Sequence, residues 1–251
     1  MAGETHAVTI GDDGLLPPWS TVFDVIEATD FNDWVLVGGL MVQLHARRAS
    51  IPPPRATKDV DLVVDVAVNK SSVTVIATAL TGIGFEPVVP AGRKDPIYRF
   101  QRSLEQVDVM VADHLPSQFT PRFMMRPAFA VVAGEQSLRR RDTFVVASSS
   151  RTVTLGAPDV LGALVGKGAA SVIDSRDPRR HLDDAAVLLA SIASVGELQL
   201  SSLSANDRKR LRLIASALTS RVAPSWLPLE AAIQERGRRN LAALIIAAGI
   251  G

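Results

Sequence analysis

The sequence contains no cysteine, which excludes disulfide bonds and metal sites built from thiolates. It also lacks a strong charge of either sign, because 27 Lys and Arg stand against 26 Asp and Glu and give a net charge of +1. Any affinity for nucleic acid must therefore come from local clusters of basic residues. The absence of cysteine fits a reducing compartment, so we expect a cytoplasmic protein.

Long apolar runs are missing as well. The longest, Leu241–Gly251, is well short of the roughly 20 residues that a membrane-spanning helix needs, and predicts a packed C-terminal helix. The N-terminus, Met-Ala-Gly-Glu-Thr-His, has no basic segment followed by an apolar one and is not a signal peptide. We therefore expect no membrane association. With 47% hydrophobic and 21% charged residues, the composition is typical of a globular protein with a substantial core.

The spacing of apolar residues changes near residue 157. Before it, strands and helices are mixed: we predict helices over 21–29, 40–47 and 71–80, and strands over 34–37, 60–66, 85–89, 97–101, 106–112, 128–132 and 143–147. The prolines at 52–54 predict an extended loop. Beyond it, four segments have helical spacing: 158–173, 179–193, 205–220 and 229–248. The sequence thus predicts an α/β (α+β) domain over 1–156, with a mixed sheet flanked by helices, and an all-helical domain over 157–251.

Two aspartates stand out in the first half. Asp59 and Asp61 begin the Val-rich segment 60–66, and residues two apart on a strand point to the same face. Two carboxylates held this close repel each other unless a cation or a proton lies between them. A hard divalent cation with oxygen ligands, most simply Mg²⁺, is the expected occupant. Asp108, a lone acid in an apolar strand, is the candidate for a third carboxylate because its burial requires a partner or a cation.

Gly38 and Gly39 lie between a predicted strand and a predicted helix, about twenty residues before the aspartates. A glycine pair at such a turn lets backbone N–H groups approach a phosphate, and the helix N-terminus adds positive potential. Glycines at strand–helix turns are common without any ligand. Followed by Asp-x-Asp on the next strand, however, this pair indicates a site for nucleotidyl transfer.

The second half offers basic residues. Lys167 interrupts an apolar helix, where its side chain either reaches the surface along the helix or meets phosphate oxygens. His181 has no second histidine at metal-ligand spacing, which excludes a zinc site. Basic residues also cluster at several places, which are ordinary solvated faces or an RNA-binding surface: 139–141, 179–180, 208–212 and 236–239.

Together these residues resemble a known family. Gly38-Gly39, the segment Arg55-x-Thr57-x-Asp59-x-Asp61-Leu62 and the lone Asp108 look like the minimal DNA-polymerase-beta-like nucleotidyltransferases. Lys167, followed by a basic linker and a helix near Leu182-Asp183-Asp184, is similar to the AbiEii-type toxins of abortive-infection and toxin–antitoxin systems. These include mycobacterial toxins that add nucleotides to the 3′ end of transfer RNA. The resemblance covers roughly residues 34–190.

The resemblance implies a role for each residue. Gly38 and Gly39 would hold the triphosphate, with Thr57 also at the nucleotide, although many members of the superfamily have Gly-Ser where this chain has Gly-Gly. Asp59 and Asp61 would bind Mg²⁺, and Asp108 would complete the metal site or act on the attacking hydroxyl. Lys167 would contact phosphates. Asp184, with Asp183 as the alternative, would orient Lys167 or the nucleotide.

The expected activity is Mg²⁺-dependent transfer of a nucleoside monophosphate from an NTP to an RNA acceptor, such as the 3′ end of tRNA. The protein would act as a toxin restrained by a cognate antitoxin protein. Two alternatives stay open. One is a nucleotidyltransferase that modifies a small molecule such as an aminoglycoside, although the arginine-rich helical half argues for an anionic acceptor. The other is a catalytically inactive nucleotidyltransferase fold that serves as a binding module.

Overall fold

The computed structural model of the chain describes residues 3–53, 55–67, 70–116 and 118–250. Contacts within the chain divide it into two compact units. The first comprises Met1–Met41 and Thr57–Pro158, and the second comprises Val42–Ala56 and Asp159–Gly251. The chain therefore passes from one unit to the other at three places, between 41 and 42, 56 and 57, and 158 and 159. The domain boundary expected after residue 156 stays a prediction.

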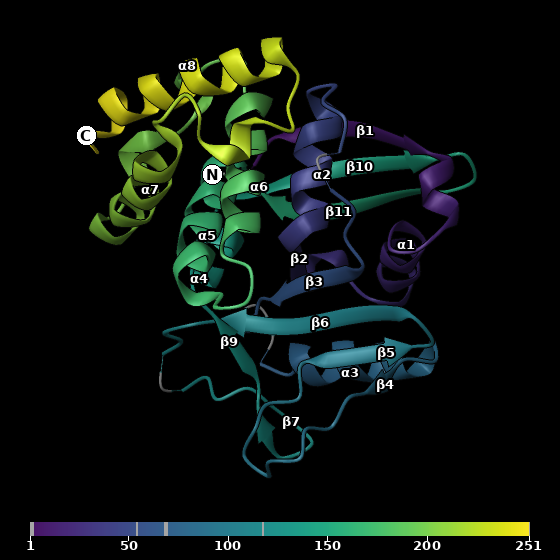
Figure 1. The fold of residues 1–251 in the computed structure, drawn as a ribbon. Helices are drawn as coiled ribbons and strands as arrows, with labels where there is room; N and C mark the ends of the chain where they lie inside the picture. Colours follow the sequence, from purple (N-terminus) through teal and green to yellow (C-terminus); the bar gives the residue numbers. More distant parts are fainter. Residues whose placement is uncertain (1–2, 54, 68–69, 117, 251) are drawn as a thin grey trace. The chain divides into compact units, whose positions relative to one another are not determined.

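A six-stranded mixed sheet forms the centre of the first unit (Figure 1). Its strands are β2 (Trp34–Val37), β3 (Asp59–Val64), β4 (Glu86–Pro87), β5 (Arg99–Arg102), β6 (Glu105–Ala112) and β9 (Phe129–Val131). The order is β2-β3-β6-β5-β4, and β9 also pairs with β6. β3 and β6 are parallel, whereas β2 pairs with β3 and β5 with β6 in antiparallel fashion. The two strands predicted to carry the aspartates are therefore direct neighbours.

The residues of β3 alternate between two environments. Val60, Leu62 and Val64 lie on one face and are fully buried, which anchors the strand in the core. Asp59 and Asp61 lie on the other face and are only partly buried. The strand thus combines a hydrophobic face, which fixes its register, with a polar face that is available for chemistry.

Apolar packing closes the other end of the aspartate face. Val63, two residues after Asp61, forms a buried cluster with Val35 of β2 and Met110 of β6. Leu138 of the short helix α4 (Gly134–Arg139) packs against this cluster. The carboxylates therefore begin where the hydrophobic packing of this face ends.

A second, three-stranded sheet completes the first unit. It consists of β1 (Thr5–Gly11), β10 (Arg141–Ser148) and β11 (Thr152–Pro158), with β1 parallel to β10 and β11 antiparallel to it. β11 contacts β2 of the larger sheet. Besides α4, this unit contains the helices α1 (Trp19–Ala28) and α3 (Ser72–Gly82). The short strands β7 (Arg122–Phe123) and β8 (Arg126–Pro127) form a hairpin.

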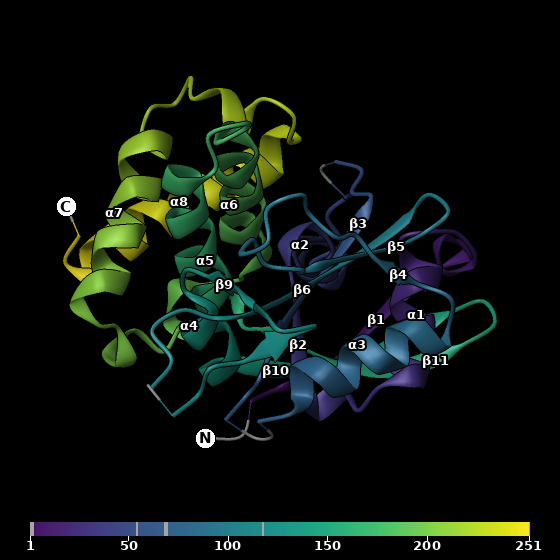
Figure 2. The ribbon, with the colours of Figure 1, turned by 90° about the horizontal axis from the view of Figure 1, so that it is seen from below.

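The second unit is helical. It takes the C-terminal part of α2 (Gly38–Arg48) together with α5 (Val160–Ile173), α6 (Arg179–Ser191), α7 (Ala205–Leu218) and α8 (Ala231–Ala248). Figure 2 shows α5 to α8 gathered in one group, and α6 contacts α5, α7 and α8. Asp159 caps α5 by accepting a hydrogen bond from the Gly162 N–H at 2.7 Å. Ser204 and Asp207 form the capping box that starts α7.

The predicted fold class is confirmed: the chain forms mixed sheets flanked by helices, followed by C-terminal helices. The strand over 34–37 matches exactly the observed bounds of β2, and the four predicted C-terminal helices are α5 to α8. The prediction missed β1, β7, β8, β11 and α4. Pro54, in the predicted proline loop, lies outside the described residues. Among the helices that are described, none is both long and apolar enough to cross a membrane.

Candidate active site

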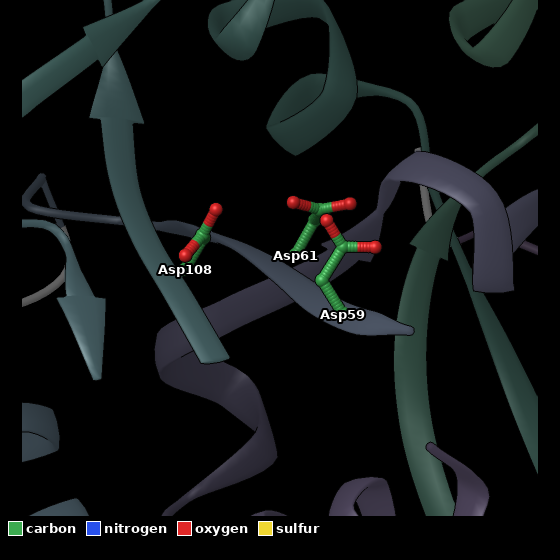
Figure 3. Close-up of side chains that lie close together, drawn as sticks. All are labelled: Asp59, Asp61 and Asp108. Carbon is green, nitrogen blue, oxygen red and sulfur yellow. The ribbon is translucent and has the colours of Figure 1, made fainter. Parts of the chain in front are cut away.

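Three carboxylates converge on one face of the large sheet. Asp61 is directly opposite Asp108 in the parallel pairing of β3 with β6, and Asp59 is opposite Gln106. Because paired residues of neighbouring strands point to the same side, all three aspartates share a face. Each offers an oxygen within 4.8 Å of the other two. Figure 3 shows Asp59 and Asp61 on one strand and Asp108 on its neighbour.

Gly38 makes this arrangement sterically possible. It ends the turn from β2 into α2 with φ of +71°, a left-handed conformation that favours glycine. A Cβ atom at this position would lie 1.9 Å from the Asp61 Oδ2 atom. Gly38 therefore both forms the turn and leaves room for the Asp61 carboxylate. The N-terminus of α2 begins here and adds positive potential beside that carboxylate.

Thr57 acts on the first aspartate. Its hydroxyl donates a hydrogen bond of 3.0 Å to the Asp59 Oδ1 atom, and its side chain is buried. The threonine predicted at the nucleotide therefore holds the Asp59 carboxylate in a fixed orientation. Gly39 is the second residue of α2, so it belongs to the same strand–helix turn as Gly38.

Asp108 has a partner that the sequence interpretation did not identify. Arg99 of β5 donates from Nε to Oδ1 at 2.9 Å and from Nη2 to Oδ2 at 2.8 Å. Asp108 is 6% exposed, and this burial raises the pKa of its carboxyl above the ordinary value, although Arg99 opposes the shift. The bonds to Asp108 raise the pKa of Arg99, so the guanidinium stays charged. The pair is thus a partly buried, two-pronged ion pair inside the candidate site.

The three aspartates fit a divalent cation. Carboxylate oxygens are the ligands that Mg²⁺ and Mn²⁺ prefer, and three of them come from adjacent strands within reach of one ion. Like charges at this separation also make a bound cation favourable, since it removes their mutual repulsion.

The helical unit contains its own charged cluster. Lys167 of α5 and Asp184 of α6 are 5% and 1% exposed, and the Lys167 Nζ atom lies 2.7 Å from the Asp184 Oδ2 atom. Arg55 donates to both oxygens of the same carboxylate at 3.1 Å. Burial raises the pKa of Asp184, but Lys167 and Arg55 outweigh it and leave that pKa below its ordinary value. Asp184 is thus the shared anion of two cations.

The two neighbouring aspartates of α6 differ sharply. Asp183 is partly exposed and its nearest cation is Arg179, at 3.9 Å, whereas Asp184 is buried against Lys167. Of the two aspartates, Asp184 is therefore the one that contacts Lys167. Its catalytic role stays a prediction. One turn earlier, His181 is buried and bonds Asp174 through Nε2 at 3.0 Å.

Several arginines of the predicted basic clusters contact their own unit. Arg208 donates to the Ala248 carbonyl oxygen, and Arg238 donates to that of Arg221 at 2.6 Å. Arg141 of the first unit donates to the carbonyl oxygens of Phe31 and Asn32. Other basic side chains of the helical unit are exposed: Arg176, Arg179, Arg180, Lys209, Arg212, Arg221 and Arg239.

Comparison with known proteins gives one structural likeness to report. No protein-family model and no curated protein matches the chain. The fold is similar to that of an antigenic nucleotidyltransferase-like protein from Paracoccidioides brasiliensis, with a TM-score of 0.47 and 20% sequence identity. The alignment covers 78% of this chain and 86% of that one.

Replacement of Gly38 by alanine should damage the aspartate site. The new methyl group would displace the Asp61 carboxylate, and the left-handed backbone should cost about 1–2 kcal/mol. Urea unfolding should show this loss of stability, and stabilisation by added Mg²⁺ should weaken. Gly82→Ala is the matched control, because a Cβ there meets nothing within 4 Å. If Gly38→Ala and Gly82→Ala have the same stability and the same stabilisation by Mg²⁺, the steric role of Gly38 is contradicted.

Asp184→Asn should be strongly destabilising because it removes the negative charge that lies 2.7 Å from the buried Lys167 ammonium group. The loss in free energy of unfolding should be on the order of 3–5 kcal/mol. The neighbouring Asp183→Asn should stay within about 0.5 kcal/mol of the wild type, since its side chain is more exposed and its ion pair is long. A similar loss in both variants would argue against the distinct role of Asp184.

The lowered pKa of Asp184 also predicts how the stability of the protein depends on pH. The folded-state pKa of Asp184 is lowered, so its stabilisation is present above the ordinary value of 3.8 and is lost as the pH falls below it. The difference in stability between the wild type and Asp184→Asn should therefore narrow below that pH. Urea titrations at a series of pH values would measure the difference.

Proposed function

We propose that this protein is a nucleotidyltransferase that transfers a nucleoside monophosphate from an NTP to a hydroxyl group of RNA and releases pyrophosphate. One observation carries the proposal: three carboxylates from adjacent strands meet beside a glycine turn at the start of a helix. This combination places cation ligands next to backbone groups that suit a triphosphate.

The residues of the first unit have separate tasks in this proposal. Asp59 and Asp61 would hold Mg²⁺, with Thr57 fixing the orientation of Asp59. Gly38 and Gly39 would let the triphosphate approach the backbone at the start of α2. Asp108 would complete the metal site or orient the attacking hydroxyl. Bound Mg²⁺ would neutralise charge on the phosphates and lower the pKa of that hydroxyl.

Lys167 and Asp184 would act as a pair. The ammonium group of Lys167 lies 2.7 Å from the Asp184 Oδ2 atom, which orients it, and a lysine ammonium can bind phosphate oxygens as a point charge. Arg55 adds a second cation to the same carboxylate and keeps it ionised. These contacts support the role that the family resemblance suggests for both residues.

An RNA acceptor accounts for the basic surface of the helical unit. The net charge of the whole chain is only +1, yet exposed basic side chains remain on α7 and α8 after the internally bonded arginines, among them Arg180 of α6, are set aside. Local positive charge is what a phosphate backbone requires. By the resemblance to AbiEii-type toxins, we propose the tRNA 3′ end as the acceptor, in the cytoplasm, with a cognate antitoxin protein restraining the reaction.

Asp61→Asn should abolish transfer while the fold is kept, because it removes one cation ligand without changing side-chain size. The test incubates total RNA with Mg²⁺ and each labelled NTP in turn, and follows label in the RNA. Circular dichroism would confirm the fold. Asp113→Asn, an acid that lies after β6 and outside the three-carboxylate cluster, is the control and should keep activity. Equal labelling by wild type and Asp61→Asn would refute the assigned site.

The same variant tests the toxin role. Expression of the wild type without an antitoxin should slow growth of a bacterial host, and Asp61→Asn should relieve the effect at matched protein levels. If both strains grow equally although transfer to RNA is measured, the enzyme is not a toxin in that host. If labelled nucleotide appears on aminoglycosides and not on RNA, the small-molecule alternative replaces the RNA proposal.

RNA binding should depend steeply on salt through the helical unit. Each phosphate contact contributes about 0.7–0.9 to the slope of log affinity against log salt, so Lys209→Gln, Arg212→Gln and Arg239→Gln together should lower it by about two. A triple replacement of exposed basic residues of the first unit, at Arg93, Lys94 and Arg139, is the control. Filter binding over a range of salt gives both slopes. If only the replacement at Arg93, Lys94 and Arg139 lowers the slope, the RNA-binding surface lies on the first unit instead.

A further inference from the structure

The bond between Arg99 and Asp108 changes the charge of the candidate site. Both oxygens of Asp108 accept hydrogen bonds from Arg99, at 2.8 and 2.9 Å, and the carboxylate is 6% exposed. An ion pair of this geometry is hard to separate, because loss of Arg99 would leave the Asp108 carboxylate as a lone charge in a poorly hydrated place. The Arg99 guanidinium also lies 5.6 Å from the centre of the Tyr98 ring, which favours a cation at this position.

The position of Arg99 follows from the strand pairing. β5 and β6 form a hairpin whose register sets Arg102 opposite Glu105 and Arg99 opposite Asp108. Asp108 is in turn opposite Asp61 across β3 and β6. Three strands thus place Arg99, Asp108 and Asp61 in one row across the sheet. The arginine is therefore part of the site and cannot be treated as a surface charge nearby.

The charges of this row and Asp59 can be summed directly. Three ionised aspartates carry −3, and the Arg99 guanidinium brings the sum to −2. One divalent cation neutralises a charge of −2. Without Arg99, the sum of −3 would attract a cation more strongly or recruit a second one.

We infer that Arg99 supplies the countercharge for Asp108, so that the nucleotide-free site binds a single divalent cation on Asp59 and Asp61. This inference rests on the proposed function, because it assumes that the aspartates bind a cation at all. Arg99 then acts as a positioning residue: it holds Asp108 in a fixed orientation and sets the affinity and the number of cations. Asp108 stays bonded to Arg99 while the first cation binds.

Binding of Mn²⁺ to the full chain without nucleotide tests the inference, with free Mn²⁺ measured by electron paramagnetic resonance. The wild type should bind one ion. Arg99→Gln, with a site charge of −3, should bind Mn²⁺ about tenfold or more tightly, or bind a second ion. Arg99→Lys keeps the charge and should stay within about threefold of the wild type. Thermal unfolding in each Mn²⁺ concentration would show that the variants are folded.

A compensating pair of changes separates charge from direct ligation. Asp108→Asn alone leaves a site charge of −1 and should weaken Mn²⁺ binding about tenfold or more. The double variant Arg99→Gln/Asp108→Asn restores −2 without burying a lone charge, so it should fold and bind within about threefold of the wild type. If Asp108 is instead a ligand of the resting ion, the double variant stays as weak as Asp108→Asn, which overturns the inference.

Arg102→Gln is the matched control on the same strand. Arg102 also makes a two-pronged bond to an acid, Glu105, at 2.8 and 2.9 Å, but the acids that it contacts are Glu105 and Asp24, outside the three-carboxylate cluster. The Arg102→Gln variant should therefore bind Mn²⁺ with the same affinity and number of ions as the wild type. Two ions in the wild type, or equal binding by Arg99→Gln and the wild type, would refute the role of Arg99. No Mn²⁺ binding by the wild type, or equal binding by Asp61→Asn, would refute the proposed metal site itself.

Discussion

Repulsion among three carboxylates is the constraint on which the first unit depends. Asp59, Asp61 and Asp108 offer oxygens within 4.8 Å of one another, and such a group tends to drive its strands apart. The buried face of β3 and the apolar cluster around Val63 hold the strands together on either side of it. Hydrophobic packing therefore stabilises an arrangement that electrostatics alone would oppose, which is common where a protein binds a cation.

The two units differ in the charges that surround a buried carboxylate. In the first unit, Asp108 has one guanidinium partner and two other aspartates nearby, and burial leaves its pKa raised. In the second, Asp184 has two cations, and its pKa is lowered in spite of deeper burial. The single guanidinium thus only partly offsets the cost of burying Asp108, whereas two cations make Asp184 a stable anion that orients Lys167.

Much of this arrangement could be predicted from the sequence. The alternation in Asp59-Val-Asp61-Leu62 gave the shared face, because a period of two is a property of any strand. The helices after residue 157 had clear periodicity, and the four predicted segments correspond to α5 to α8. The polar strand β1 and the glycine-containing β11 were missed, since each gains its place by pairing with β10 and not by a strong pattern of its own.

Arg99 was missed for a different reason, although a signal was present. The turn at Ser103 and Leu104 fixes the hairpin register, and counting outward from it pairs Arg99 with Asp108. Arg55 could not be found in this way, because its bond to Asp184 spans 129 residues and depends on how the helical unit folds. Local counting therefore reaches contacts across a hairpin, whereas contacts between distant segments need the tertiary structure.

The discontinuous second unit has a practical consequence for dissecting the protein. A fragment that starts at Asp159 would contain α5 to α8 but would lack Val42–Ala56, which supplies the end of α2 and Arg55. Asp184 would keep Lys167 and lose its guanidinium partner. A cut at the apparent start of the helical half would thus divide one folding unit, and a stable helical fragment would have to carry residues 42–56 joined to it, for example by circular permutation.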